Sequence, residues 1–254
     1  MSKKCLDYNN ILQLLEHQAK IFAKYPFIWE KEENNWVATS WSEFVQEARF
    51  FAAALLYLGI QDNQAISVLS SNIREWPIVD FGSIYAGGIT SGIYPTSSPE
   101  QIAYMVNKSE SFALFVDSKA QLEKVNKVRN EFISKVLITK ESLASDPKLG
   151  FYNYSDFIKL GAREYPNYIS KIEEVVQNRR QQDIAIYVFT SGTTGDPKAA
   201  MLSHRYYLSS ADSIQEIFSF QPGEKILSFL PYCHVGERIF GLAVSVAAGR
   251  QIYH

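Results

Sequence analysis

The order of apolar and polar residues along the chain changes repeatedly between a helical period and a strand period. From Trp41 to Leu58 the apolar residues recur every three or four positions, at Phe44, Ala48, Phe51, Leu55 and Leu58. This spacing predicts a long helix with one buried face. Ser40 and Glu43 have the spacing of a capping box at its start. A shorter helix and a hairpin are predicted before it, over Ile11–Phe22, Phe27–Trp29 and Trp36–Thr39.

Short apolar runs then alternate with helical patterns. Strands are predicted at Ala65–Leu69, Thr90–Tyr94, Phe112–Val116 and Val136–Thr139. Helices are predicted between them, at Glu75–Ala86, Ser98–Asn107 and Lys119–Asn130. This alternation predicts an α/β fold with a largely parallel sheet flanked by helices on both faces.

The remaining part of the chain has a less regular pattern at first. Residues 140–182 contain two prolines and two glycines, Pro147, Gly150, Gly161 and Pro166, and are expected to form helical pieces joined by loops. A strand over Ile184–Phe189 then leads into a glycine-rich loop. Further elements are predicted at His204–Phe218, Ile226–Leu230, Glu237–Ala248 and Arg250–Tyr253. The last of these is a strand with no partner after it, so the domain is expected to be incomplete.

Composition restricts the class of protein. Of 254 residues, 46% are hydrophobic and 20% are charged, which is typical of a globular domain. A net charge of −2 argues against a nucleic-acid partner, and the basic stretch Lys124–Arg129 is expected on a solvated helix face. Cys5 and Cys233 have no metal-site spacing. The amino terminus has no apolar core long enough for a signal peptide, and no apolar stretch is long enough to span a membrane, so a cytoplasmic protein is expected.

The residues with the most informative chemistry form the loop Thr190–Lys198, which reads TSGTTGDPK. Its glycines allow the backbone to approach an anion, while amide groups, hydroxyls and a lysine can surround phosphate oxygens. In a Walker A loop the lysine directly follows the last glycine, and a serine or threonine comes next. Here Asp196 and Pro197 intervene and Ala199 follows the lysine. The loop therefore predicts a phosphate site of a different kind.

This loop resembles the signature TSGTTGxPK of the adenylate-forming superfamily, with matches at eight of nine positions. The segment Leu230–Arg238, LPYCHVGER, resembles the LPxxHxxER segment of long-chain fatty acid–CoA ligases. Ser71–Pro77 and Gly92–Gln101 resemble the amino-terminal half of the same family. The family usually has glycine where this chain has Ala199. That difference costs about 1 kcal/mol if the backbone needs a positive φ, and is nearly neutral otherwise.

The resemblance implies that residues 1–254 are the amino-terminal part of an AMP-binding domain. Residues 1–60 would form an opening helix–hairpin–helix unit, residues 61–203 an α/β unit that ends in the phosphate loop, and residues 204–254 the start of a second α/β unit. Members of the family continue into segments that contact adenine and ribose, and into a small domain with a catalytic lysine. These parts are expected to lie outside this chain.

The resemblance also implies a reaction. In the family, a fatty acid reacts with ATP to give an acyl-adenylate and pyrophosphate, and coenzyme A then displaces AMP. Lys198 would contact the β- and γ-phosphates as a catalytic residue. The nucleotide would also be bound by the hydroxyls and backbone of Thr190, Ser191, Gly192, Thr193, Thr194 and Gly195. Mg²⁺ is expected with the nucleotide, and its protein ligands cannot be assigned from this sequence.

By the same resemblance, His234 lies beside the acid, where its imidazole could orient the carboxylate. The alternative is a structural histidine bonded to a neighbouring carbonyl. Glu237 and Arg238 are further candidates for the acid pocket, or form an ion pair at a helix start. The implied partners are small molecules, namely fatty acid, ATP and coenzyme A. A homodimer and peripheral membrane contact stay open.

Two other functions remain open at this stage. The chain could be a non-catalytic nucleotide-binding or interaction module that kept the loop. It could also belong to an adenylating ligase for a medium-chain or aryl acid, because the residues that line the acyl tunnel of the family mostly lie beyond residue 254. A long-chain ligase is the hypothesis taken forward, and the 254-residue chain alone is expected to be inactive.

Overall fold

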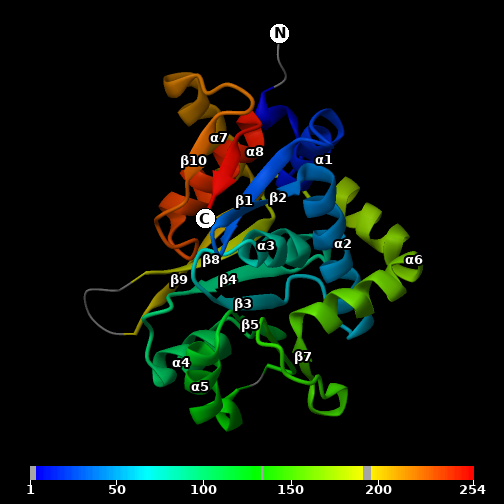
Figure 1. The fold of residues 1–254 in the computed structure, drawn as a ribbon, viewed down its shortest axis with the longest axis vertical. Helices are drawn as coiled ribbons and strands as arrows, with labels where there is room; N and C mark the ends of the chain where they lie inside the picture. The colour runs from blue at the N-terminus through cyan, green and yellow to red at the C-terminus, as the bar shows by residue number, and fades with distance from the viewer. Residues whose placement is uncertain (1–3, 133, 191–195) are drawn as a thin grey trace.

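The computed structural model describes residues 4–132, 134–190 and 196–254. Its largest element is a seven-stranded sheet with the order β7-β6-β5-β3-β4-β8-β9 (Figure 1). The strands are β3 Ala65–Leu69, β4 Ile89–Ile93, β5 Ala113–Val116, β6 Val136–Thr139, β7 Phe151–Asn153, β8 Ile184–Thr190 and β9 Lys198–Ser203. All neighbours are parallel except the pair β8–β9. The predicted α/β fold with a largely parallel sheet is confirmed.

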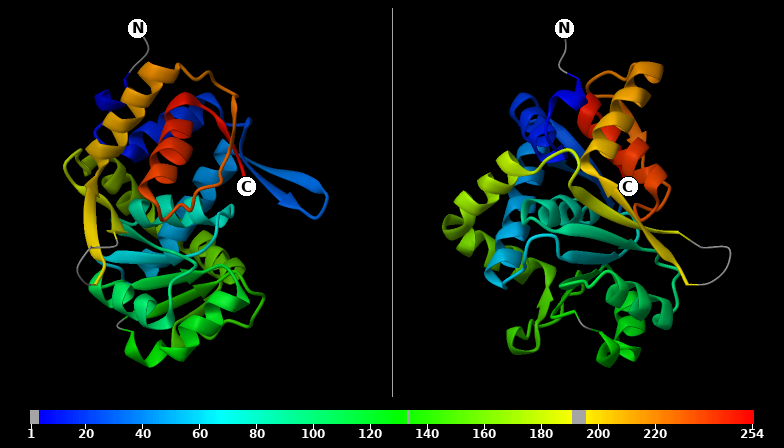
Figure 2. Two further views of the ribbon diagram at one scale, coloured as in Figure 1. Left: turned by 90° about the vertical axis from the view of Figure 1, so that its left-hand side faces the viewer. Right: turned by 180° about the vertical axis from the view of Figure 1, so that it is seen from behind.

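Helices flank this sheet on both faces. Alternate residues of each strand point to opposite faces, so the sheet has a hydrophobic core on each side. In β5, Phe115 belongs to the larger core, whereas Leu114 and Val116 belong to the smaller one. The larger core also contains residues of α2 Trp41–Tyr57, α3 Glu75–Tyr85 and α6 Tyr154–Asn178. The smaller core contains residues of α4 Pro99–Lys108 and α5 Lys119–Lys127, which lie together at one end of the molecule (Figures 1 and 2).

A second sheet has four strands in the order β10-β11-β1-β2, and periodicity alone did not predict it. The strands are β1 Pro26–Glu32, β2 Asn35–Ser40, β10 Lys225–Leu227 and β11 Gln251–Tyr253. Strand β11 is parallel to both of its neighbours, β1 and β10. The strand that was expected to lack a partner therefore has two. Trp29 Nε1 donates to Gln251 Oε1 at 2.7 Å across this junction.

The other helices are α1 Ile11–Ile21, α7 His204–Phe218, the π-helix η4 Glu237–Ala243 and α8 Val244–Ala248. They lie together near the amino terminus, at the end of the molecule opposite α4 and α5 (Figures 1 and 2). Short 3₁₀ helices are formed by Cys5–Asp7, Arg129–Glu131 and Pro147–Leu149. In the described part of the chain, no helix combines the length and the apolar character that crossing a bilayer would require.

The predicted helix caps are present. Ser40 Oγ accepts from the Glu43 amide at 3.3 Å, and Glu43 Oε2 accepts from the Ser40 amide at 2.8 Å. Ser98 and Gln101 form the same reciprocal pair at the start of α4. These short-range hydrogen bonds satisfy amide groups that the first helical turn leaves unpaired.

Over residues 154–178 the prediction of broken helical pieces was wrong. Helix α6 runs for 25 residues without interruption, with Pro166 inside it on an exposed face. Gly161 allows the helix to approach α2, because a Cβ atom there would lie 1.8 Å from the carbonyl oxygen of Phe50. Both residues were interpreted as helix breakers, but one is tolerated and the other is needed for packing.

Candidate active site

The candidate phosphate loop connects the two strands of an antiparallel hairpin. Strand β9 was not predicted, and it pairs with β8 so that Thr190 lies opposite Lys198. Thr190 Oγ1 donates to the Lys198 carbonyl oxygen at 3.4 Å. The structure thus brings the first and last residues of the predicted loop together. The predicted phosphate contacts Ser191, Gly192, Thr193, Thr194 and Gly195 lie outside the described residues.

Ala199 lies within β9, where it pairs with Phe189. It is not among the described non-glycine residues with a positive φ. An extended strand residue needs no glycine, so the alanine costs little at this position. The departure from the family pattern does not distort the hairpin.

A pocket with a volume of about 430 Å³ opens at the carboxyl ends of β4 and β8. Its lining includes Tyr94 and Thr96, which follow β4, and Phe189 and Thr190, which end β8. The same pocket is lined by His234. Ligands of α/β proteins bind at this edge of a parallel sheet. Two of the predicted site residues, Thr190 and His234, line one pocket at this edge of the sheet.

The imidazole of His234 is exposed to this pocket and has a defined hydrogen bond. Its Nδ1 accepts from the Gly236 amide at 3.0 Å. A neutral ring that accepts at Nδ1 carries its proton on Nε2, which can donate to a carboxylate oxygen. Among the described residues, the imidazole makes no hydrogen bond to a neighbouring carbonyl oxygen, which was the alternative.

The segment before His234 is held by Asn72, which follows β3. Asn72 Nδ2 donates to Ser228 Oγ at 2.8 Å and to the Leu230 carbonyl oxygen at 2.7 Å. Asn72 Oδ1 accepts from the Tyr232 amide at 3.1 Å. The ring of Tyr232 stacks on Trp76 with centroids 5.0 Å apart. These bonds also explain why the predicted strand Ile226–Leu230 ends earlier, at Leu227.

Arg238 and Glu237 do not pair with each other. The guanidinium of Arg238 forms a fully buried ion pair with Asp80 of α3 and lies 5.0 Å from the ring centroid of Trp76. Burial raises the pKa of Asp80, and the positive charge of Arg238 opposes that rise. Glu237 is also buried, which raises its pKa. Neither Glu237 nor Arg238 lines the pocket, and their predicted roles toward the acid stay predictions.

Lys198 lines a second and larger cleft, with a volume of about 960 Å³. Lys108 and Asp196 line the same cleft, and Pro197 borders both hollows. Tyr104 donates from its hydroxyl to the Pro197 carbonyl oxygen at 3.3 Å, which fixes the end of the loop against α4. The assignment of Lys198 to the β- and γ-phosphates stays a prediction.

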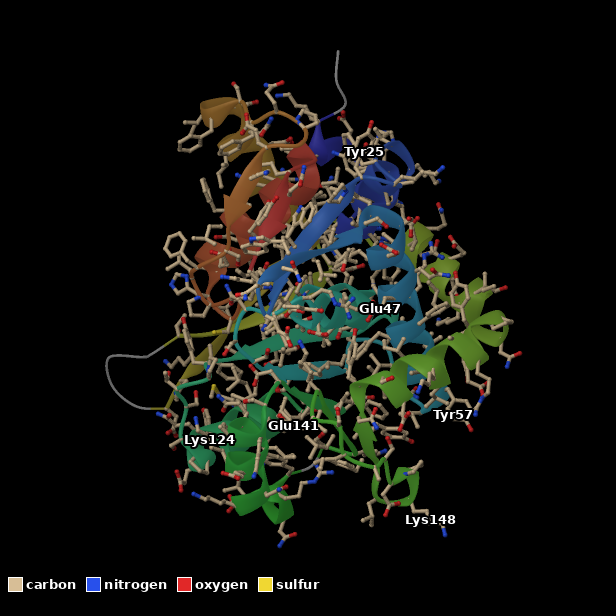
Figure 3. The ribbon with its side chains drawn as sticks, viewed as in Figure 1. Tyr25, Glu47, Tyr57, Lys124, Glu141 and Lys148 are labelled. Atoms are coloured by element: carbon tan, nitrogen blue, oxygen red, sulfur yellow. The ribbon has the colours of Figure 1, made fainter. Side chains whose placement is uncertain are left out.

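Helix α5 forms hydrogen bonds with the loop that follows β4 and lines the pocket. Lys124 Nζ donates to the carbonyl oxygens of Pro95 and Ser97, at 2.6 and 3.2 Å. Lys124, labelled in Figure 3, is half-buried rather than on the fully solvated face that the basic stretch suggested. A lysine within a run of basic residues carries no sequence signal for such a role.

A groove of about 420 Å³ lies between α7 and the π-helix η4. Its lining is apolar at Ile214, Ile239 and Phe240 and polar at three serines and Tyr206, and Val235 borders both the groove and the pocket. A pocket with an imidazole donor is therefore adjacent to a groove that is apolar in part. This combination suits a ligand with an anionic head and an apolar tail.

The described residues offer no protein site for a metal. No cluster of three or more histidine, cysteine, aspartate or glutamate side chains among them could hold an ion. The expected Mg²⁺ therefore has no such cluster of protein ligands among the described residues.

Residues 15–254 match the profile of a family described as AMP-binding enzyme. The chain belongs to this family. Among curated members, it is 28% identical over 234 residues to the human long-chain-fatty-acid–CoA ligase ACSBG2, covering 91% of this chain and 35% of that protein. It is 30% identical over 228 residues to human ACSBG1, covering 87% of this chain and 31% of that protein. The chain thus spans about a third of the length of these relatives.

Solved structures of other proteins share the fold. The anthranilate CoA ligase AuaEII, solved with anthranoyl-AMP, superposes with a TM-score of 0.80 at 18% identity, over 99% of this chain and 46% of that one. The N-terminal domain of FACL13 from Mycobacterium tuberculosis superposes with a TM-score of 0.71 at 16% identity, over 96% of this chain and 56% of that one. At these identities the likeness concerns the fold alone.

Proposed function

We propose that this chain is the amino-terminal part of the AMP-binding domain of a long-chain fatty acid–CoA ligase. The observation that carries the proposal is the pocket that is lined both by Thr190, at the base of the glycine-rich loop, and by His234. One group begins a loop suited to phosphate, and the other offers a proton donor for a carboxylate. An enzyme that joins a carboxylate to a nucleotide needs both anions in one place.

In this proposal, different residues bind the two anions, which are the carboxylate and the triphosphate. Nε2–H of His234 donates to a carboxylate oxygen and directs the other oxygen at the α-phosphorus of ATP. Lys198 and the loop residues Ser191–Gly195 hold the β- and γ-phosphates and stabilise the charge on the departing pyrophosphate. Mg²⁺ would accompany the nucleotide and offset phosphate charge. The thiol of coenzyme A then attacks the acyl carbon, and AMP leaves.

The preference for a long acyl chain rests on the groove between α7 and η4. Val235 borders both hollows, so an acid with its carboxylate near His234 can extend its tail along Ile239 and Phe240. Burial of each methylene contributes about 0.8 kcal/mol, which favours a long tail over a short one. The names of ACSBG1 and ACSBG2 agree with this substrate class.

The test is acid-dependent exchange of pyrophosphate into ATP, measured on the protein encoded by the full reading frame. Exchange is expected with long-chain acids such as palmitate. Lys198→Ala should reduce the rate about 100-fold or more, because a cation at the phosphates is lost. Lys108→Ala is the matched control, since this exposed lysine lines the same cleft from α4.

Other outcomes would assign a different function. Exchange with only medium-chain or aryl acids would indicate a ligase of that class. ATP binding that Lys198→Ala abolishes, without exchange for any acid, would indicate a non-catalytic nucleotide-binding module. We expect the 254-residue chain alone to show no turnover.

A further inference from the structure

We propose that Asp80 and Asn72 are positioning residues that set the orientation of His234 in the pocket. Both act through the backbone segment that carries the histidine, and neither lines the pocket itself. The carboxylate that His234 would orient comes from the proposed function, whereas the positioning rests on contacts within this chain.

Asp80 acts through Arg238, which follows His234 in the sequence. The amide of Arg238 donates to the His234 carbonyl oxygen at 3.2 Å, so the two residues share one helical turn. The Arg238 side chain reaches across to Asp80, and both are buried, at 0% and 1% exposure of the side chain. The Asp80 carbonyl oxygen also accepts from Thr90 Oγ1 of β4 at 3.2 Å. The turn that begins at His234 is thereby tied to α3, and α3 is tied to the sheet.

Asn72 acts before His234. Its amide group bonds to Ser228, Leu230 and Tyr232, and so holds three residues of the incoming segment with one side chain. The segment then turns, and the His234 amide donates to the Pro231 carbonyl oxygen at 2.8 Å. The histidine is therefore fixed on both sides along the chain.

The sheet supports the same segment from beneath. A Cβ atom at Gly92 of β4 would lie 2.8 Å from Cys233 Cα. The backbone just before His234 therefore rests directly on the strand whose carboxyl end forms the pocket. The segment is bonded before and after His234 and packs on β4. These contacts therefore determine the orientation of the histidine.

The chemistry of the pair favours positioning over stabilisation. A buried ion pair adds little net stability compared with apolar residues of the same volume, but it permits one arrangement, since any displacement leaves a charge unpaired. The guanidinium of Arg238 also lies 5.0 Å from the ring centroid of Trp76 and 5.8 Å from that of Tyr207, so two aromatic rings lie beside the pair.

The experiment uses NMR of the 254-residue chain, with the His234 signals assigned through a His234→Gln sample. The ¹⁵N shifts of the imidazole report which ring nitrogen carries the proton. We expect the Nε2–H form in the wild type and a mixture of both forms in Asp80→Asn and in Asn72→Ala. The control is Glu16→Gln, which removes one charge of a partly buried ion pair, with Arg49 at 2.6 Å, away from this segment. It should keep the Nε2–H form.

A second readout is a titration with dodecanoate, followed at the same imidazole signals. The apparent affinity should fall about tenfold or more in Asp80→Asn and stay unchanged in Glu16→Gln. If Asp80→Asn does not fold, Asn72→Ala decides alone, since Asn72 is only partly buried.

Unchanged His234 signals in the folded variants would overturn the positioning role, as would an equal change in Glu16→Gln, which would show general loosening. If dodecanoate leaves the wild-type signals unchanged while the two variants still alter the tautomer, the positioning role stands. The proposed function fails separately, if the protein encoded by the full reading frame shows no acid-dependent pyrophosphate exchange, so the two failures can be distinguished.

Discussion

His204 begins α7 with its imidazole enclosed by protein, at 1% exposure. Burial lowers its pKa to about 4, and the positive charge of Arg179 adds to this effect while Asp183 opposes it. Nδ1 has no hydrogen-bond partner among the described residues. The folded state therefore favours the neutral ring in the range where an exposed histidine takes up a proton.

Stability should consequently fall as the solution becomes acidic. Between pH 6.5 and about pH 4 the unfolded chain binds a proton at His204 and the folded chain does not, so protonation favours unfolding. By pH 5 the loss from this group should be about 2 kcal/mol. Urea unfolding at pH 7 and pH 5 measures it in the wild type and in His204→Gln, which should lose less.

His17→Gln is the control, because it makes the same substitution at an exposed histidine outside this enclosed site. An identical pH dependence in wild type and His204→Gln would contradict the assignment of the effect to His204.

At the scale of elements, helix α6 shows how neighbours override local preference. Proline removes a helical hydrogen bond and glycine weakens a helix, so both disfavour a continuous helix over residues 154–178. Helix α6 forms because Phe157, Ile172 and Val176 are buried in the larger core. The absence of a side chain at Gly161 also allows close packing against Phe50 of α2.

Substitutions at these two positions should have opposite effects on stability. Pro166→Ala restores a helical amide on an exposed face and should raise the free energy of unfolding by about 1–3 kcal/mol. Gly161→Ala forces α6 away from Phe50 and should lower it by about 1–3 kcal/mol. Urea unfolding measures both, with the exposed Ser170→Ala as a near-neutral control. A neutral Gly161→Ala would show that the two helices are not in close contact.

At the scale of the whole molecule, both sheets share one continuous core. Ile28 and Ile252 of the four-stranded sheet belong to the same buried cluster as Ile66 and Phe115 of the seven-stranded sheet. Strand β11 occupies the middle of the smaller sheet, between β1 and β10. Elements from the two ends of the chain therefore depend on each other for stability, although they are far apart in the sequence.

We expect the two sheets to unfold together. Ile252→Asp places an unpaired charge where the wild-type side chain is fully buried, and should destabilise the chain by several kcal/mol. Hydrogen exchange should then accelerate by a similar factor at the amides of β1 and of β3–β5. Ile252→Val is the conservative control. Faster exchange confined to β1, β10 and β11 would instead show that the smaller sheet unfolds separately.

The sequence by itself determined the fold class, most element positions, the helix caps and the position of the candidate phosphate loop. These features depend on spacing over a few residues, as in the capping pair Ser40 and Glu43 or the apolar period of α2, and such spacing is visible in one dimension. The resemblance of two motifs indicated the family, and the family profile agrees with it.

Only the tertiary structure decided the remainder. An ion pair between Arg238 and its neighbour Glu237 was one alternative left open, but Arg238 pairs with Asp80, which is 158 residues away. The tertiary structure also decides the pairing of β11 with β1, the continuity of α6 and the hydrogen bonds from Asn72 to the His234 segment. Periodicity reports which face of an element is buried but not what it is buried against, so each of these partners became known only when distant segments were brought into contact.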